Sequence, residues 1–68
     1  MKKKLLYKEI ELIENINPIL KRGLKGVILE INNKDSVFAE FVDKKGHKIE
    51  FDKKFVFDLK MDQFKLKN

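Results

Sequence analysis

The chain has 68 residues, of which 43% are hydrophobic and 40% are charged, a balance typical of a small soluble globular domain. A chain of this length forms one domain with a single core and has no room for a doubly wound sheet or a cofactor-binding fold. Cysteine is absent, which excludes disulfides, thiolate nucleophiles and cysteine-based zinc sites. Most of the formal net charge of +5 lies in the first 25 residues. We therefore interpret the rest as a solvated, nearly neutral surface rather than a dedicated polyanion site.

No segment carries the signal of a membrane span or a secretory leader. Uncharged apolar runs such as residues 26–29 are far shorter than the roughly 20 residues that a membrane helix needs. Residues 2–4 are lysines that resemble the start of a leader, but Glu9 and Glu11 interrupt the region where its apolar stretch would lie. We expect a cytoplasmic protein without a membrane partner, and a flexible basic N-terminus over residues 1–6.

The first periodic segment, residues 7–14, predicts a strand. Ile10 and Leu12 alternate with acidic neighbours, as a half-buried strand requires. A helix over residues 3–15 is the alternative, because several of the same apolar residues also fit a period of 3.6. The loop chemistry that follows directly, ending at Pro18, favours the strand.

The middle of the chain predicts two further strands separated by polar turns. Gly23 and Gly26 bracket a tight turn that leads into a β-branched strand over residues 26–31. A polar turn over residues 32–36 then leads to a strand over residues 37–42.

The clearest turn signal in the chain is the segment that opens with Asp43 and closes with Gly46. A glycine in that place supplies the positive φ that a hairpin of this length requires. The hairpin predicts a returning strand over residues 47–52. The remaining chain is expected to form a strand, a single helical turn and a closing strand, over residues 55–59, 61–63 and 64–66.

Five or six short strands with turns every 8–12 residues or so predict an all-β fold, a small barrel that occupies residues 7–68 as one domain. The apolar residues expected to form its core are Ile10, Leu12, Val27, Leu29, Ile31, Val37, Ala39, Phe41, Ile49, Phe51, Phe57 and Leu66.

The segments LKRGLKGVILEI, VFAEFVDKKGHKIEF and KMDQFKL resemble a family of short bacterial proteins of unknown function. The matching positions are Gly23, Gly26, Glu40, Phe41, Asp43, Gly46, Asp62 and Phe64. Val27 and Ala39 depart from the pattern, where the family commonly has threonine and valine. The resemblance implies a five- or six-stranded SH3-like barrel. Because such proteins are often encoded near toxin or restriction-type modules, it also implies an immunity or antitoxin role.

The residue types argue against catalysis and against a bound metal or cofactor. His47 is the only histidine and sits in the predicted hairpin, where no nucleophile accompanies it. One histidine without cysteine is poor material for zinc, which takes about three protein ligands even in its open sites. Glu40 and Glu50 would lie close together across the hairpin, but neighbouring lysines neutralise them. We expect no enzyme activity and no cofactor.

Side chains that alternate with the predicted core predict a partner surface. If residues 39 and 41 point inward, the outer face of the hairpin carries apolar groups between charges, a pattern typical of interfaces. Val56 has the same kind of outward parity beside Phe55 and Phe57. The predicted partner-binding residues are Phe38, Glu40, Val42, Lys48 and Glu50. We expect a protein partner, either a toxin or a second copy of the chain.

Nucleic-acid binding is the alternative function. The segment GLKGVILEI has a weak likeness to the KOW-type barrels that bind RNA, and exposed aromatics could stack on bases. The cations that would serve are Lys21, Arg22 and Lys25. The nearly neutral body and the single arginine favour the protein-binding interpretation.

Overall fold

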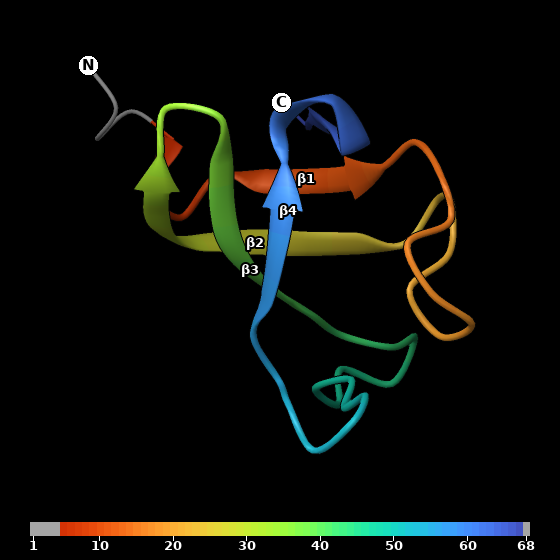
Figure 1. Ribbon diagram of the computed structural model, residues 1–68. Coiled ribbons are helices and arrows are strands. Elements are labelled where there is room, and N and C mark those ends of the chain that lie inside the picture. The colour runs from red at the N-terminus through yellow and green to blue at the C-terminus, as the bar shows by residue number, and fades with distance from the viewer. Residues whose placement is uncertain (1–4, 68) are drawn as a thin grey trace.

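The computed structural model describes residues 5–67 and contains five antiparallel strands in one sheet (Figure 1). The strands are β1 (Glu9–Leu12), β2 (Lys25–Asn33), β3 (Ser36–Phe41), β4 (Phe57–Lys60) and β5 (Phe64–Leu66). Their order is β4-β3-β2-β1-β5, so each of β1 to β3 is the neighbour of the next strand in the chain, and β5 pairs with β1. In Figure 1, β1 runs nearly across β4, because the sheet is strongly curled. The predicted all-β fold of five or six short strands is confirmed, and the curled five-stranded sheet is compatible with a small barrel.

Helical structure in the described residues is limited to short 3-10 turns, one of which, η2 (Met61–Gln63), links β4 to β5. The single helical turn expected at residues 61–63 is therefore confirmed. β1 replaces the helix considered as an alternative for residues 3–15, although residues 1–4 lie outside the described part. Within the expected N-terminal segment 1–6, Leu5 is partly buried and packs against the core.

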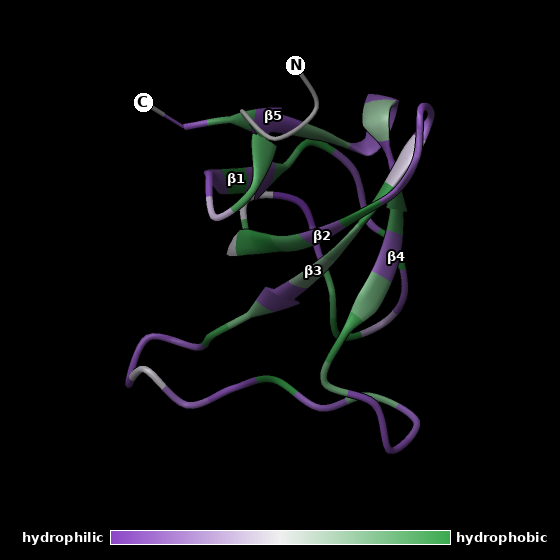
Figure 2. Ribbon diagram, turned by 90° about the vertical axis from the view of Figure 1, so that its left-hand side faces the viewer, coloured by the Kyte–Doolittle hydropathy of each residue, from purple (hydrophilic) through white to green (hydrophobic). Residues whose placement is uncertain are grey.

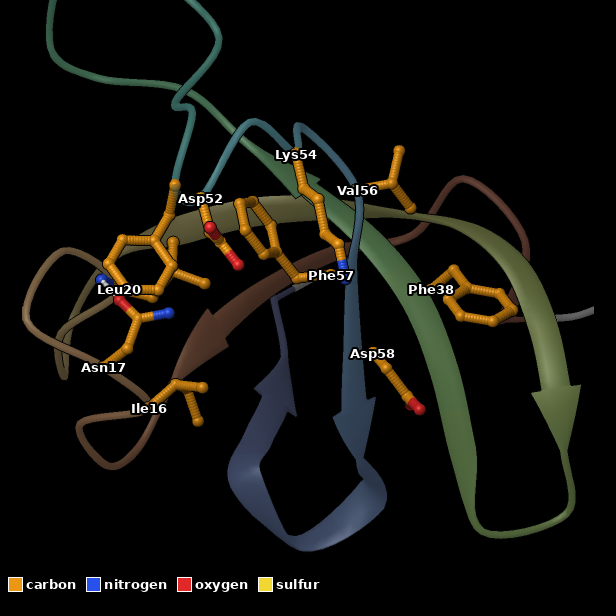
Figure 3. Close-up of a pocket in the computed structure, with 10 residues that line it drawn as sticks. Ile16, Asn17, Leu20, Phe38, Asp52, Lys54, Val56, Phe57 and Asp58 are labelled. Carbon is orange, nitrogen blue, oxygen red and sulfur yellow. Dashed lines mark hydrogen bonds between the residues drawn. The ribbon is translucent and has the colours of Figure 1, made fainter.

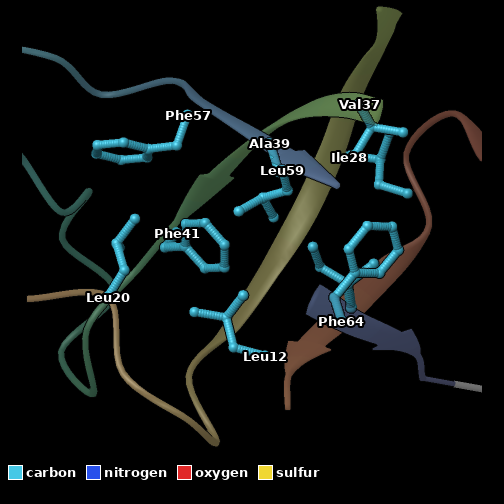
Figure 4. Close-up of a cluster of buried hydrophobic side chains, with 10 residues drawn as sticks. Leu12, Leu20, Ile28, Val37, Ala39, Phe41, Phe57, Leu59 and Phe64 are labelled. Carbon is cyan, nitrogen blue, oxygen red and sulfur yellow. The ribbon is translucent and has the colours of Figure 1, made fainter. Parts of the chain in front are cut away.

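Ten buried apolar side chains form the core between the two halves of the curled sheet (Figure 4). They are Ile10, Leu12, Leu20, Ile28, Val37, Ala39, Phe41, Phe57, Leu59 and Phe64. Of the residues predicted in the core, Val27, Leu29, Ile31, Ile49 and Phe51 are only half-buried, and Leu66 is exposed. Phe64 and Leu66 have the same parity in β5 and lie on the same face of the strand, but only Phe64 is buried, whereas Leu66, the last residue of the strand, stays exposed.

The inward residues of β2 do not follow a simple alternation, because the strand contains a bulge. Ile28 pairs with Ala39, whereas Glu30 pairs with the next residue, Phe38, so Leu29 is an extra residue in the ladder. Apolar side chains occupy both parities of this strand, and alternation alone therefore does not say which face is inside.

The loop between β1 and β2, residues 13–24, is held by two asparagine side chains. Asn17 Oδ1 accepts hydrogen bonds from the backbone N–H groups of Ile19 and Leu20, at 2.8 and 2.7 Å. Asn15 Oδ1 accepts another from the N–H of Arg22 at 2.8 Å. Together with the backbone bond from Ile16 N–H to the Leu20 carbonyl at 2.8 Å, these side-chain bonds hold the path of the loop that places Leu20 in the core.

The two glycines before and within β2 serve different purposes. Gly23 has φ +92° in a turn closed by the bond from Leu24 N–H to the Lys21 carbonyl at 3.1 Å. Gly26 lies inside β2, and a Cβ there would meet the Phe41 ring at 2.5 Å. Close packing, rather than the turn expected from the sequence, therefore requires a glycine at position 26.

The turn predicted at Asp43 is confirmed, but the returning strand over residues 47–52 is wrong. Asp43 N–H donates to the His47 carbonyl at 2.9 Å, and Gly46 adopts φ +85°. Beyond the turn only an isolated bridge between Val42 and Lys48 and a bond from Ile49 N–H to the Phe41 carbonyl continue the pairing.

The strand that pairs with β3 is β4, which is shorter than the strand predicted over residues 55–59. Its register places Leu59 opposite Val37 and Phe57 opposite Ala39. A strand has only two edges, and β2 and β4 occupy both edges of β3 up to Ala39. Only the end of β3 is therefore left for the segment after Asp43.

Candidate functional site

Exposed apolar side chains gather where the chain enters β4. Phe55 and Val56, which directly precede this strand, are 47% and 42% exposed. Figure 2 shows apolar colouring along the start of β4 and charged loop tips below it. Large apolar groups left open to water beside a strand are typical of a surface that a partner covers.

A groove of about 330 Å³ lies beside β4, and we call it the β4 groove (Figure 3). Its apolar wall consists of Ile16, Leu20, Phe38, Phe51, Val56 and Phe57. Its polar residues are Asn17, Asp52, Lys54 and Asp58. Figure 3 shows the residues of the 13–24 loop on one side of β4 and Phe38 on the other.

The five predicted partner-binding residues fall in more than one place. Phe38 is half-buried and lines the β4 groove. Glu40 and Lys48 form an ion pair, with Oε1 and Nζ 3.3 Å apart, whose Lys48 side chain is largely exposed. Val42 lines a second hollow of about 440 Å³ near the start of β2, and Glu50 is exposed on the loop before β4.

The cations predicted for nucleic acid are all exposed, and one of them, Lys25, lies opposite an acidic residue. Lys21 and Arg22 lie on the loop before β2, and Lys25 begins that strand opposite Glu11. The pKa of the Glu11 carboxyl is lowered by its hydrogen bond from the side chain of Lys67 and by nearby lysines, Lys25 among them. A carboxylate that stays ionised here reduces the positive potential available to a phosphate backbone.

The Asp43 turn carries a second perturbed carboxyl. The pKa of Asp43 is lowered by hydrogen bonds from backbone N–H groups, first that of His47 and then that of Lys45. Asp43 Oδ1 accepts them at 2.9 and 2.8 Å. This carboxylate holds the turn, and its Oδ2 lies 3.8 Å from Nδ1 of the largely exposed His47 imidazole.

Among residues 5–67, no three side chains of His, Cys, Asp or Glu gather in a group that could hold a metal ion. The same part of the chain contains no helix with the length and apolar character required to cross a membrane.

No family model, curated protein or solved structure matches this chain. The resemblance to short bacterial proteins therefore stays a prediction.

Sequence reasoning missed most of the β4 groove. Val56 had a usable signal, because it alternates with Phe55 and Phe57. Ile16 and Leu20 carry no such signal, since they lie in a loop whose path depends on asparagine hydrogen bonds. Phe51 was assigned to the core because residues 47–52 were predicted as a paired strand.

Proposed function

We propose that the chain is a non-catalytic protein-binding module that contacts its partner through the β4 groove. The observation that carries this proposal is the cluster of accessible apolar side chains at the start of β4, next to a groove with an apolar wall. Removing such side chains from water contributes about 25 cal/mol for each Å² of apolar surface, which favours association against the entropy that binding costs.

The polar residues of the groove support the same function. Asp52, Lys54 and Asp58 bring charges of both signs to the edge of an apolar wall. Apolar centres with polar rims are the usual composition of protein interfaces, where the rim orients the partner. A polyanion site, in contrast, concentrates cations of one sign.

The partner is another protein. The sequence resemblance points to a toxin as the class of partner, with an immunity or antitoxin role for this chain. Phe38 belongs to the proposed contact surface. Glu40 and Lys48 form an ion pair with each other and are not part of that surface.

Affinity capture from the source cell tests the proposal. The bait proteins are the wild type, Phe38→Ser, Val56→Ser and Leu66→Ser, each first shown to fold by circular dichroism. Leu66 is the matched control, because it is 42% exposed like Val56 but lies on β5, outside the groove lining.

We expect one specific protein to be recovered by the wild type and by Leu66→Ser, and to be lost with both groove variants. The captured protein is then purified and its affinity measured against the same four baits. Equal affinity for all four, or capture that disappears on nuclease treatment, contradicts the proposed function.

A further inference from the structure

β4 lies at one end of the sheet and exposes a strand edge. Among residues 5–67, β3 is the only strand that pairs with it. The edge lies against the β4 groove, because Val56, Phe57 and Asp58 all line that hollow. A strand edge of this kind is a template on which another extended segment can add.

The hydrogen-bond alternation shows which backbone groups point outward. The bond from Met61 N–H to the Asp35 carbonyl, at 3.0 Å, continues the β3–β4 ladder by one pair. In an antiparallel ladder, every second residue bonds the neighbouring strand. Phe57 and Leu59 therefore direct their backbone groups to β3, whereas Asp58 and Lys60 direct theirs away from it.

One end of this edge is already closed. The Lys60 N–H, which points away from β3, donates to Oε1 of Gln63 at 2.9 Å. The backbone N–H and carbonyl of Asp58 are thus the groups that an added strand meets, and Asp58 itself lines the groove.

A second copy of the chain fits this edge poorly. Two β4 strands paired about Asp58 would place two carboxylates directly opposite each other, which destabilises a strand pair. Pairing about Leu59 would match Asp58 with Lys60. That pairing would need the Lys60 N–H, which already donates a hydrogen bond to the Gln63 side chain. The geometry therefore favours a segment of a different protein.

The side chains near the edge specify the chemistry of that segment. Asp58 shares its face of the sheet with Phe38, its partner across the β3–β4 ladder. A residue added opposite Asp58 lies on this same face, so a lysine or arginine there meets the carboxylate. The residues before and after it point to the opposite face, where the partly buried Ile16 lines the groove beside the buried Phe57 and Leu20.

We propose that the β4 groove binds an extended segment of a partner protein as an additional strand along β4, with a basic side chain opposite Asp58 and apolar side chains on either side of it. This inference rests on the proposed function and specifies how the groove is used.

The probe is a displayed library of random peptides about ten residues long, selected on the immobilised wild-type protein. An enriched peptide is synthesised and its affinity measured by fluorescence anisotropy. The first test variant, Asp58→Pro, removes the backbone N–H that points away from β3 and makes no hydrogen bond within the sheet. The second, Asp58→Lys, reverses the charge of the side chain. Asp58→Asn is the matched control, because it keeps the N–H and removes only the charge.

We expect enriched peptides with a basic residue between apolar ones. Asp58→Pro and Asp58→Lys should each weaken binding by about tenfold or more, and Asp58→Asn by a few-fold. Bound peptide should also slow hydrogen exchange at the Asp58 amide of the wild type, a readout that does not depend on whether the proline variant folds.

Three results overturn the inference. In the first, the peptides no longer bind Val56→Ser, but they bind all Asp58 variants equally and do not slow exchange at the Asp58 amide. The groove would then be a binding site, but not by strand addition. A library that yields no groove-dependent peptide would overturn strand addition and the proposed function together. A wild-type dimer in sedimentation that Asp58→Pro converts to monomer would identify the occupant as a second copy.

Discussion

At the scale of single residues, polar side chains fix the conformation of loops that lie outside the short strands. Asn17 accepts two backbone hydrogen bonds and so fixes the path of the 13–24 loop. Leu20 depends on that path, since it is fully buried although it lies outside any strand. The same loop supplies one side of the β4 groove.

We expect Asn17→Ala to lower the free energy of unfolding by about 1–2 kcal/mol, because two backbone donors lose their acceptor. Urea unfolding followed by circular dichroism measures the change. Asn33→Ala is the control, because Asn33 Oδ1 accepts only the single bond from Asp35 N–H in an exposed turn. An equal loss for both variants would mean that Asn17 does not organise the loop.

Asp43 should make the turn at residues 43–47 sensitive to acid. Its pKa is lowered in the folded protein by the backbone N–H groups of His47 and Lys45. A group with a lowered folded pKa adds stability above its unfolded pKa, and that contribution disappears as the pH falls through the folded value. The turn is therefore expected to loosen below about pH 4, where an ordinary aspartate takes up its proton.

Amide NMR shifts of Lys45 and His47 followed against pH test this expectation. Their common midpoint should lie below the ordinary pKa of aspartate. Asp43→Asn should remove the midpoint, because its amide oxygen still accepts hydrogen bonds but does not titrate in this range. A midpoint at or above the ordinary value would rule out the proposed role of the carboxylate.

At the scale of elements, the segment before β4 contains a turn whose residues fit it poorly. Phe51 and Lys54 exchange both backbone hydrogen bonds at 3.0 Å around a two-residue turn. Its central residues, Asp52 and Lys53, have φ of 55° and 64°. This is the conformation of a type I′ turn, for which asparagine followed by glycine is preferred.

Lys53→Gly should raise the free energy of unfolding by about 1 kcal/mol, because glycine adopts positive φ without the steric cost that lysine bears. Thermal and urea unfolding measure the gain. Lys54→Gly, at an adjacent position without positive φ, should bring no gain and a small loss. If both substitutions destabilise the protein, steric strain at Lys53 is not a significant cost.

The strands show where alternation in the sequence is informative. In β1, Ile10 and Leu12 alternate with glutamates, so their inward direction could be predicted and is observed. In β2 the apolar run occupies both parities and a bulge shifts the register, so Ile28 is buried in place of the predicted Val27 and Leu29. The predicted Ile31 pairs with Val37 and packs against the core.

At the scale of the whole molecule, the charge distribution bears on which class of partner the surface can bind. The exposed Lys25 lies opposite Glu11, whose carboxyl has a lowered pKa, whereas Lys21 and Arg22 are exposed on the loop before β2. The β4 groove, in contrast, combines apolar surface with both signs of charge.

We expect single-stranded RNA of random sequence to bind only weakly and to dissociate by about 0.2 M salt, because contacts between lysines and phosphates weaken steeply with salt. Fluorescence anisotropy at several salt concentrations measures this dependence. Val56→Ser should leave the weak binding unchanged. Micromolar or tighter binding that persists at the higher salt would establish the alternative function as an RNA-binding barrel.

Much of the fold follows from local chemistry that the sequence determines by itself. The Asp43–Gly46 turn, the positive φ of Gly23 and the alternation in β1 each depend on residues close together in the chain. So does the overall succession of short strands and turns, from which the all-β barrel was predicted.

Only the tertiary structure decided which strand pairs with β3 and where the groove lies. Residues 47–52 and β4 could both have paired with the same edge of β3, and the choice depends on the packing of Phe57 and Leu59 into a shared core. Leu20 is buried, and Ile16 lines the groove, for the same reason: their positions depend on contacts with residues distant in the chain. Local sequence patterns do not encode such competition, because its outcome is a difference in packing energy between whole arrangements.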